Sequence, residues 1–131
     1  GYICNIKCLW MKNSLIKLSY RSILILISAI FIFAGVDKII IRPEMSELFR
    51  TFGLPNEFMV IVGFTELVLG MMVQAKYFTK LSLHGMIFIL SFAVLLHLLN
   101  HQYFATLLPL SIISMIMVTL NLGQKVRNMP K

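Results

Sequence analysis

Charged residues are scarce in this sequence, and acidic residues are the scarcest. Of the 131 residues, 13% are charged and 59% are hydrophobic, with 12 basic residues against 5 acidic ones. A soluble domain typically has about 25% charged and about 45–50% apolar residues, so this apolar excess does not fit into one small soluble core. The composition excludes a soluble globular enzyme and a disordered tail. In a membrane chain the basic excess indicates loops that face anionic lipid, so no nucleic-acid partner is expected.

Cysteine is also missing from the apolar part of the sequence. Cys4 and Cys8 both precede the first apolar segment, which excludes a secreted disulfide scaffold and an intramembrane Cys-x-x-Cys enzyme. Residue 1 is Gly, and the sequence MKNS at residues 11–14 is typical of a natural start. If the protein starts there, residues 1–10 and both cysteines are not native.

Four apolar segments are long enough to cross a bilayer, which takes about 20 residues with some variation. They are Ser22–Val36, Phe58–Ala75, Leu81–Leu99 and Tyr103–Gly123. Since backbone groups in lipid must bond to one another, each segment is expected to be a helix. We therefore expect an all-α integral membrane four-helix bundle over residues 21–123, between a cytoplasmic N-terminal segment, 1–20, and a cytoplasmic tail, 124–131.

The first segment has a competing interpretation as a secretory signal peptide, because basic residues precede it. Ile32 and Phe33 occupy the region where a cleavage site needs a small residue, which disfavours that interpretation. Pro109 lies in the fourth segment and is expected to kink its helix, freeing a carbonyl toward the bundle interior.

Basic residues are concentrated on one side of the expected membrane. The outer side has three basic residues, all near the loop between the first two segments: Lys38, Arg42 and Arg50. The termini and the loop between segments two and three contain nine: Lys7, Lys12, Lys17, Arg21, Lys76, Lys80, Lys125, Arg127 and Lys131. By the positive-inside rule, both termini are expected in the cytoplasm.

The first outer loop is expected to contain a short amphipathic helix. Pro43 is a favourable first helical residue and Gly53 a favourable stop. Between them, apolar residues recur at i, i+3, i+4 and i+7: Met45, Leu48, Phe49 and Phe52. This helix is expected to lie on the outer membrane surface or to fold over the mouth of the bundle.

Glu66 is the strongest functional candidate because it interrupts an apolar segment, where an unpartnered charge costs several kcal/mol. Gly63 and Gly70 share its helix face, so this face is expected to meet another helix closely. Lys38 lies three residues after Gly35, and its depth in the membrane differs from that of Glu66 by about 8 Å. Two long side chains can just span this difference, so Lys38 and Glu66 are expected to pair. Two interpretations of Glu66 stay open: a carboxylate that moves protons or holds a ligand, and a structural hydrogen-bonding group.

The outer half of the bundle is expected to hold a polar pocket that opens outward. Glu66 and Lys38 are the candidates for its chemistry. The other expected pocket residues are Asp37, His97, Gly35, Gly63 and Gly70. His97 and His101 have the i, i+4 spacing of some helical zinc sites, but two histidines are a weak signal and no metal is expected.

Three sequence motifs follow one another in a fixed order. They are FAGVDK at residues 33–38, FRTFGLP at residues 49–55 and VGFTELVLG at residues 62–70, followed by His97 late in the third segment. Together they resemble the DoxX family of four-helix bacterial membrane proteins, over Tyr20–Leu122. The matching positions are Gly35, Lys38, Gly53, Pro55, Gly63, Glu66 and Gly70. The resemblance implies a location in the bacterial inner membrane.

The family takes its name from a membrane subunit linked to thiosulfate oxidation with quinone reduction. The resemblance therefore implies a membrane subunit of a redox or detoxification system that binds a quinone or small apolar ligand, with no covalently bound cofactor. Glu66 would accept a proton or orient the ligand, Lys38 would be its electrostatic partner, and His97 would add a second hydrogen-bonding group.

The expected partners are the lipid bilayer, a soluble or membrane redox protein, and further copies of the chain. Two alternative functions stay open. One is a non-catalytic membrane scaffold or assembly factor. The other is a small proton-coupled exporter, which fits less well because the carboxylate of such transporters lies in the first span.

Overall fold

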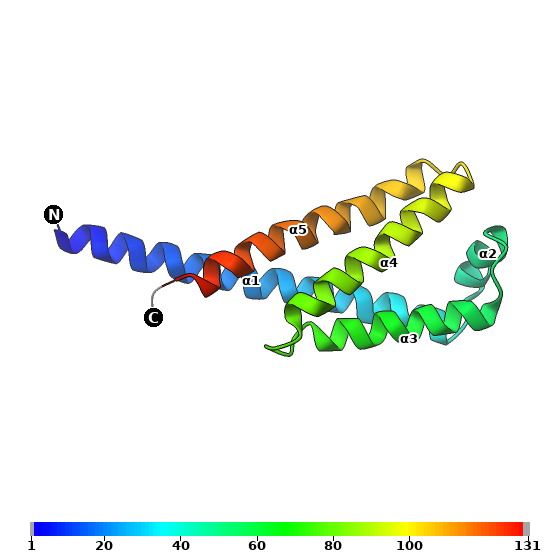
Figure 1. The fold of residues 1–131 in the computed structure, drawn as a ribbon, viewed down its shortest axis with the longest axis horizontal. Coiled ribbons are helices and arrows are strands. Elements are labelled where there is room, and N and C mark those ends of the chain that lie inside the picture. Colours follow the sequence, from blue (N-terminus) through cyan, green and yellow to red (C-terminus); the bar gives the residue numbers. More distant parts are fainter. Residues whose placement is uncertain (1, 130–131) are drawn as a thin grey trace.

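The computed structural model describes residues 2–129, with side chains from residue 5 onward, and this part of the chain is helical without any strand (Figure 1). The expected all-α fold is therefore confirmed. The predictions that involve Gly1, the Cys4 side chain and Lys131 lie outside the described part. The elements are α1 (Tyr2–Ile39), α2 (Pro43–Thr51), α3 (Asn56–Met72), α4 (Thr79–Leu99), the 3₁₀ helix η1 (Phe104–Thr106) and α5 (Leu107–Arg127).

Among the described residues, three helical segments are long and apolar enough to cross a membrane: Asn5–Ile39, Thr79–Leu99 and Phe104–Arg127. The second expected span is shorter, because α3 has 17 residues, or about 26 Å at 1.5 Å per residue. A hydrocarbon core is about 30 Å thick, so α3 lies at the lower limit for a span. Counting α2 and α3 as one unit gives a fourth span, but the two are bent by 114°.

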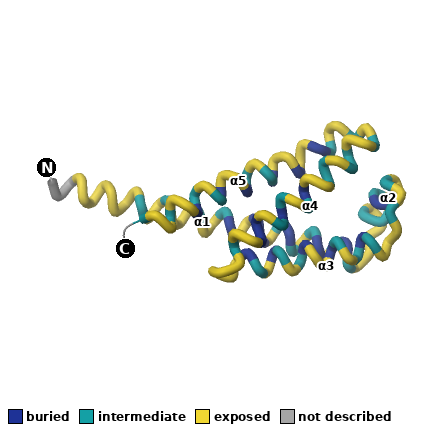
Figure 2. Tube along the Cα trace, viewed as in Figure 1, coloured by how far each residue is buried: buried dark blue, intermediate teal, exposed yellow. Residues whose placement is uncertain are grey.

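Helix α1 is longer than the first apolar segment. Its 38 residues extend about 57 Å, nearly twice the hydrocarbon thickness. The expected boundary at residues 20 and 21 lies inside this helix, because neither glycine nor proline interrupts the chain between Tyr2 and Ala34. Figure 2 shows the N-terminal part of α1 as largely exposed and separate from the bundle, and Trp10 is 70% exposed.

Helices α1 and α3 are packed against each other more closely than side chains normally allow. A Cβ added to Gly35 would lie 2.6 Å from the carbonyl oxygen of Gly63, and one added to Gly63 would lie 2.8 Å from that of Gly35. Two turns further along, Ser28 donates a hydrogen bond of 2.5 Å to the carbonyl of Gly70. Backbone contact of this kind requires glycine, so these residues fix how α1 and α3 cross.

The buried apolar core lies in the half of the bundle away from α2. It joins α1, α4 and α5 with the end of α3 through Leu24, Ile27, Phe31, Val73, Leu83, Met86, Leu90, Ile112 and Ile116. Beyond the α3–α4 loop, α4 diverges from α3 (Figure 1). The other half of the bundle is therefore less tightly closed between these two helices.

Two local predictions have different outcomes. The amphipathic loop helix is confirmed: α2 begins at Pro43, and Gly53 follows with a left-handed φ of 76°. The kink at Pro109 is wrong. Pro109 is the third residue of α5, which is continuous from Leu107 to Arg127. In the first turn, the missing N–H of proline does not interrupt the helix interior.

Candidate functional site

A cavity of about 520 Å³ lies between α1, α3, α4 and α5 and is covered by α2. Its volume falls within the range of about 300–1,000 Å³ that is typical of ligand pockets. All four residues of the apolar stripe of α2 line it: Met45, Leu48, Phe49 and Phe52. Of the two expected positions for this helix, the structure has the one folded over the bundle.

The polar side chains around the cavity are few: Lys38, Thr65, Glu66 and His97 among the described residues. The rest of the lining is apolar, with aromatic rings from α2, α3 and α4. An apolar cavity with a small number of convergent polar groups is the usual form of a small-molecule site.

Lys38 and Glu66 form an ion pair at the wall of the cavity. Lys38 Nζ donates to Glu66 Oε2 at 2.8 Å, and each side chain is 10% exposed. Lys38 Nζ also donates a longer bond of 3.5 Å to the carbonyl oxygen of Ala34. The expected pairing of these two residues is confirmed.

The glycines of α1 and α3 explain why the pair forms. A Cβ added to Gly63 would lie 2.8 Å from the Cβ of Lys38, so the missing side chain leaves room for the base of the lysine. The close crossing of the two helices then brings the ammonium group to the carboxylate. Each charge neutralises the other in a low-dielectric setting. A substitution that removes one of them therefore leaves the other charge buried and unpaired.

His97 links α4 to α2 at the outer end of the cavity. Its Nδ1 lies 2.8 Å from Oε1 of Gln102, and its ring meets that of Phe52 edge to face, with centroids 5.2 Å apart. Gln102 is not among the residues predicted from the sequence, although its position five residues after His97 in a short turn is a usable signal. Phe52 is the residue that directly follows α2, so this contact joins α4 to the end of the helix that covers the cavity.

His101 does not join His97 in a metal site. Helix α4 ends at Leu99, and His101 adopts a left-handed φ of 57° beyond it, so the helical i, i+4 geometry is lost. Its Nδ1 lies 3.0 Å from the hydroxyl oxygen of Tyr103. Residues 5–129 contain no group of three or more His, Cys, Asp or Glu side chains arranged to hold a metal ion.

Four residues expected in the pocket lie outside its lining. Asp37 pairs instead with Arg42, with Oδ1 and Nε 3.5 Å apart. Gly35, Gly63 and Gly70 lie in the contact between α1 and α3. The physical reason is that a glycine pressed against a neighbouring backbone has no surface left to offer a ligand.

An aromatic contact between α3 and α4 forms part of the cavity lining and is not predicted from the sequence. Phe58 and Phe92 both line the cavity, and their ring centroids are 6.4 Å apart. On α4 the lining residues are Phe88, Ile89, Leu90, Phe92, Ala93, Leu96 and His97. This helical spacing counted back from His97 is the signal that identifies the cavity face of α4.

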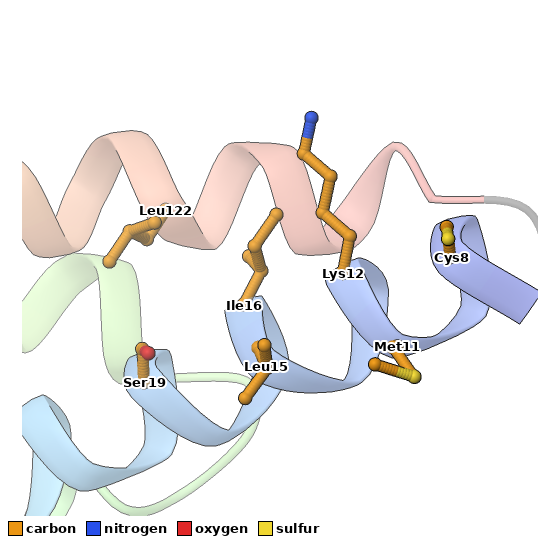
Figure 3. Close-up of a pocket in the computed structure, with 7 residues that line it drawn as sticks. All are labelled: Cys8, Met11, Lys12, Leu15, Ile16, Ser19 and Leu122. Carbon is orange, nitrogen blue, oxygen red and sulfur yellow. The ribbon is translucent and has the colours of Figure 1, made fainter.

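A second, smaller hollow of about 380 Å³ lies at the other end of the molecule, between the N-terminal part of α1 and α5 (Figure 3). Its lining residues are Cys8, Met11, Lys12, Leu15, Ile16, Ser19 and Leu122. Most of these are exposed, and Lys12 is the one charged side chain among them. This groove has no counter-charge and no convergent polar groups, so it is the weaker candidate.

Comparison with known proteins identifies the family. A sequence model described as the DoxX-like family matches residues 22–119, a range that includes every residue lining the larger cavity. Comparisons with curated proteins and with solved structures gave no match. Since the family match extends over well over half of the chain and includes Lys38, Glu66 and His97, the protein belongs to the DoxX-like family.

Proposed function

We propose that this protein is the membrane subunit of a redox or detoxification system, and that it binds a quinone or another small apolar ligand in the cavity covered by α2. The observation that carries the proposal is an ion pair, Lys38 with Glu66, at the wall of an otherwise apolar and aromatic cavity of about 520 Å³. Glu66 would orient the ligand or accept its proton, Lys38 would hold Glu66 in place, and His97 would bond a second group of the ligand.

The position of the pair favours a role in ligand binding. Both partners line the cavity, which is where a charged group acts on a small molecule. Charged groups within membrane segments are costly and mark functional sites by default.

A scaffold or assembly factor is the second candidate, and it also has an observation in its favour. Lys38 and Glu66 join α1 to α3 beside the Gly35–Gly63 contact, where an ion pair fixes the relative position of two helices. In that case the cavity would be a consequence of how α4 diverges, and a partner protein would bind the outside of the bundle.

Ligand binding can be tested by ¹³C-methyl NMR of methionine in lipid nanodiscs. Met45 lines the cavity, whereas Met117 on α5 is 60% exposed and lies outside the lining, so it serves as the internal control. On titration with a short-chain ubiquinone analogue, the Met45 methyl signal should shift and saturate while that of Met117 stays in place. An unchanged Met45 signal would contradict the proposal.

Purification in mild detergent followed by mass spectrometry separates the two candidates. Recovery of a soluble or membrane redox protein with the chain would support the redox subunit. Recovery of a client without redox chemistry, together with an unchanged Met45 signal, would favour the scaffold.

The proposal places the protein in the bacterial inner membrane with both termini in the cytoplasm, as the distribution of basic residues suggests. In a background without cysteine, single cysteines at Asn56 and Asn128 test this orientation. Both positions are exposed. An impermeant thiol reagent added to intact spheroplasts should label position 56 and leave position 128 unlabelled, and the opposite pattern would show the reverse orientation.

A further inference from the structure

We infer that the ligand of the cavity is a neutral, membrane-soluble phenol, whose hydroxyl group donates to the free oxygen of Glu66 and whose apolar tail leaves the cavity between α3 and α4. This inference rests on the proposed function and narrows it from any small apolar ligand to one with an aromatic hydroxyl group, which the reduced form of a quinone has and the oxidised form lacks.

The hydrogen bonds of Glu66 leave one oxygen available. Oε2 accepts from Lys38 at 2.8 Å, and no donor in the described part of the chain bonds Oε1. In that same part, the one enclosed side-chain polar atom without a partner is Ser82 Oγ, so Oε1 is not sealed inside protein. Glu66 lines the cavity, and an ionised carboxylate can only accept hydrogen bonds, so the ligand must donate.

Lys38 explains why a hydroxyl group fits better than other donors. An ammonium group has three N–H donors, and two of them are directed to Glu66 Oε2 and the Ala34 carbonyl. The third N–H has no acceptor among the described residues. A hydroxyl group donates to Oε1 and accepts from Nζ with the same oxygen atom, whereas an ether or a ketone can only accept.

The charge balance of the site requires a neutral ligand. Lys38 and Glu66 are the only charged side chains among the described residues that line the cavity, and they neutralise each other. An ionic ligand would bring an uncompensated charge into this apolar space, which is strongly unfavourable.

His97 is a second hydrogen-bonding group in the lining of the cavity. In the tautomer in which Nδ1 donates to Oε1 of Gln102, 2.8 Å away, Nε2 is left to accept. The walls contributed by α3 and α4 thus each offer an acceptor to the cavity. This arrangement favours a ligand that donates hydrogen bonds, such as a phenol or a hydroquinone.

The lining favours a flat aromatic head. Five phenylalanines contribute to it: Phe49, Phe52, Phe58, Phe88 and Phe92. Aromatic rings bind other aromatic rings in offset-stacked or edge-to-face contacts, as Phe52 and His97 already do. A ring with a hydroxyl group can therefore be held by its faces and oriented by its oxygen.

The tail has a route to the lipid between α3 and α4. Phe88 on α4 and Ile61 on α3 line the cavity and are nevertheless 76% and 62% exposed, so the cavity wall continues onto the outer surface of the helices. The Phe58–Phe92 contact lies about one turn further along the two helices, and α3 and α4 diverge from each other beyond the loop that joins them (Figure 1). An alkyl or isoprenoid chain leaving here would stay in contact with apolar side chains and lipid.

A matched pair of probes tests the inference: 4-nonylphenol, which has the hydroxyl donor, and 4-nonylanisole, in which a methyl group replaces the donated hydrogen. Each is titrated into the protein in phosphatidylcholine nanodiscs, and binding is followed by the Met45 methyl signal. We expect the phenol to bind at least about tenfold more tightly, since a hydrogen bond to a charged acceptor has about this effect.

Two substitutions identify the acceptor. In Glu66→Gln the amide oxygen accepts from Lys38, and the NH₂ group takes the place of the free carboxylate oxygen Oε1. This group donates instead of accepting, so the preference for the phenol should disappear. Glu57→Gln is the control, because it makes the same change at an exposed position in the first turn of α3, outside the cavity lining, and should keep the tenfold preference. If Glu66→Gln alone does not fold, the double substitution Glu66→Gln with Lys38→Met removes both charges and makes the same test.

The outcomes separate this inference from the proposed function. Equal affinity for phenol and anisole would overturn the hydroxyl assignment and leave a cavity that binds apolar ligands. A phenol preference that survives Glu66→Gln would overturn the assignment of Glu66 as acceptor. If neither probe, nor a quinone, shifts Met45, both the inference and the proposed function fail.

Discussion

Helix α3 meets α1 and α4 in opposite ways. Toward α1 it presents glycine, and a Cβ on Gly35 would lie 2.6 Å from the backbone of Gly63. Toward α4 it presents phenylalanine, and the rings of Phe58 and Phe92 have centroids 6.4 Å apart. Small side chains let two backbones touch, whereas large rings hold them apart. One helix thus anchors the bundle on one side and lines a cavity on the other.

Glu66 lies at the boundary between these two contacts. Its Oε2 is held by Lys38 on the α1 side, and the residue lines the cavity on the α4 side. The tight contact fixes the carboxylate in position without using all of its hydrogen-bonding capacity. Pre-organisation of this kind is what a binding group needs, because little ordering is left to occur when the ligand arrives.

We call the face of α3 that contacts α1 its tight side, and the face toward α4 its open side. The largest effect is expected from breaking the ion pair on the tight side. Lys38→Met or Glu66→Gln alone should lower the free energy of unfolding by about 3–5 kcal/mol, because each leaves an uncompensated charge inside the bundle. The double substitution should cost less than the sum of the two. Unfolding in detergent, measured by circular dichroism for all four proteins, gives the double-mutant cycle, and strictly additive losses would show that the two residues are uncoupled.

A smaller effect is expected from widening the contact between α1 and α3. Gly63→Ala should lower the free energy of unfolding by about 1–3 kcal/mol, because the new methyl group would meet the Gly35 carbonyl oxygen at 2.8 Å and backbone cannot yield. It should also weaken the ion pair, since the Cβ of Lys38 is equally close. The measurement is again detergent unfolding.

Gly85→Ala is the matched control for this prediction. It gains the same helix propensity, but the added methyl group would meet only the end of the Leu69 side chain, at 3.1 Å. That side chain can move, so stability should stay the same or rise by up to about 1 kcal/mol. Equal losses at positions 63 and 85 would show that the α1–α3 contact is not special.

The tight side could be predicted further from the sequence than the open side. The pairing of Lys38 with Glu66 followed from the cost of charge in an apolar segment, and α2 followed from the spacing of its apolar residues. Gly35 and Gly63 each precede a charged residue by three positions, which signals a close crossing of two helices. We nevertheless placed these glycines in the pocket, because the sequence does not say which neighbour a small-residue face meets.

The open side could not be predicted because it depends on how α4 is oriented. Apolar residues on a membrane helix have the same composition whether they face lipid, a neighbouring helix or a cavity. Phe92 therefore looks like an ordinary lipid-facing residue until the angle between α3 and α4 is known. The long continuous α1 was missed for a related reason: basic residues mark the end of the apolar segment but do not end a helix.

The smallest effect is expected at the cover of the cavity, from Phe52→Ala. This change removes the edge-to-face contact with His97, together with a longer one to Phe49. An aromatic contact of this kind has a value of about 0.5–1.5 kcal/mol. Global stability should change little, because Phe49 stays buried and α2 keeps its connection to α1 and α3. The amide protons of α2 should exchange up to about tenfold faster in hydrogen–deuterium exchange, while those of α1 and α3 should not change.

Phe104→Ala is the control for the cover, because Phe104 is 91% exposed and lies outside the cavity lining. It removes the same ring without touching α2, so exchange in α2 should match the unsubstituted protein. Faster exchange in α2 after Phe52→Ala alone would mean that the ring of Phe52, through its contacts with His97 and Phe49, holds α2 over the cavity. Unchanged exchange in both variants would mean that α2 is held by its chain connections instead, and that the open side of α3 has no closing contact at His97.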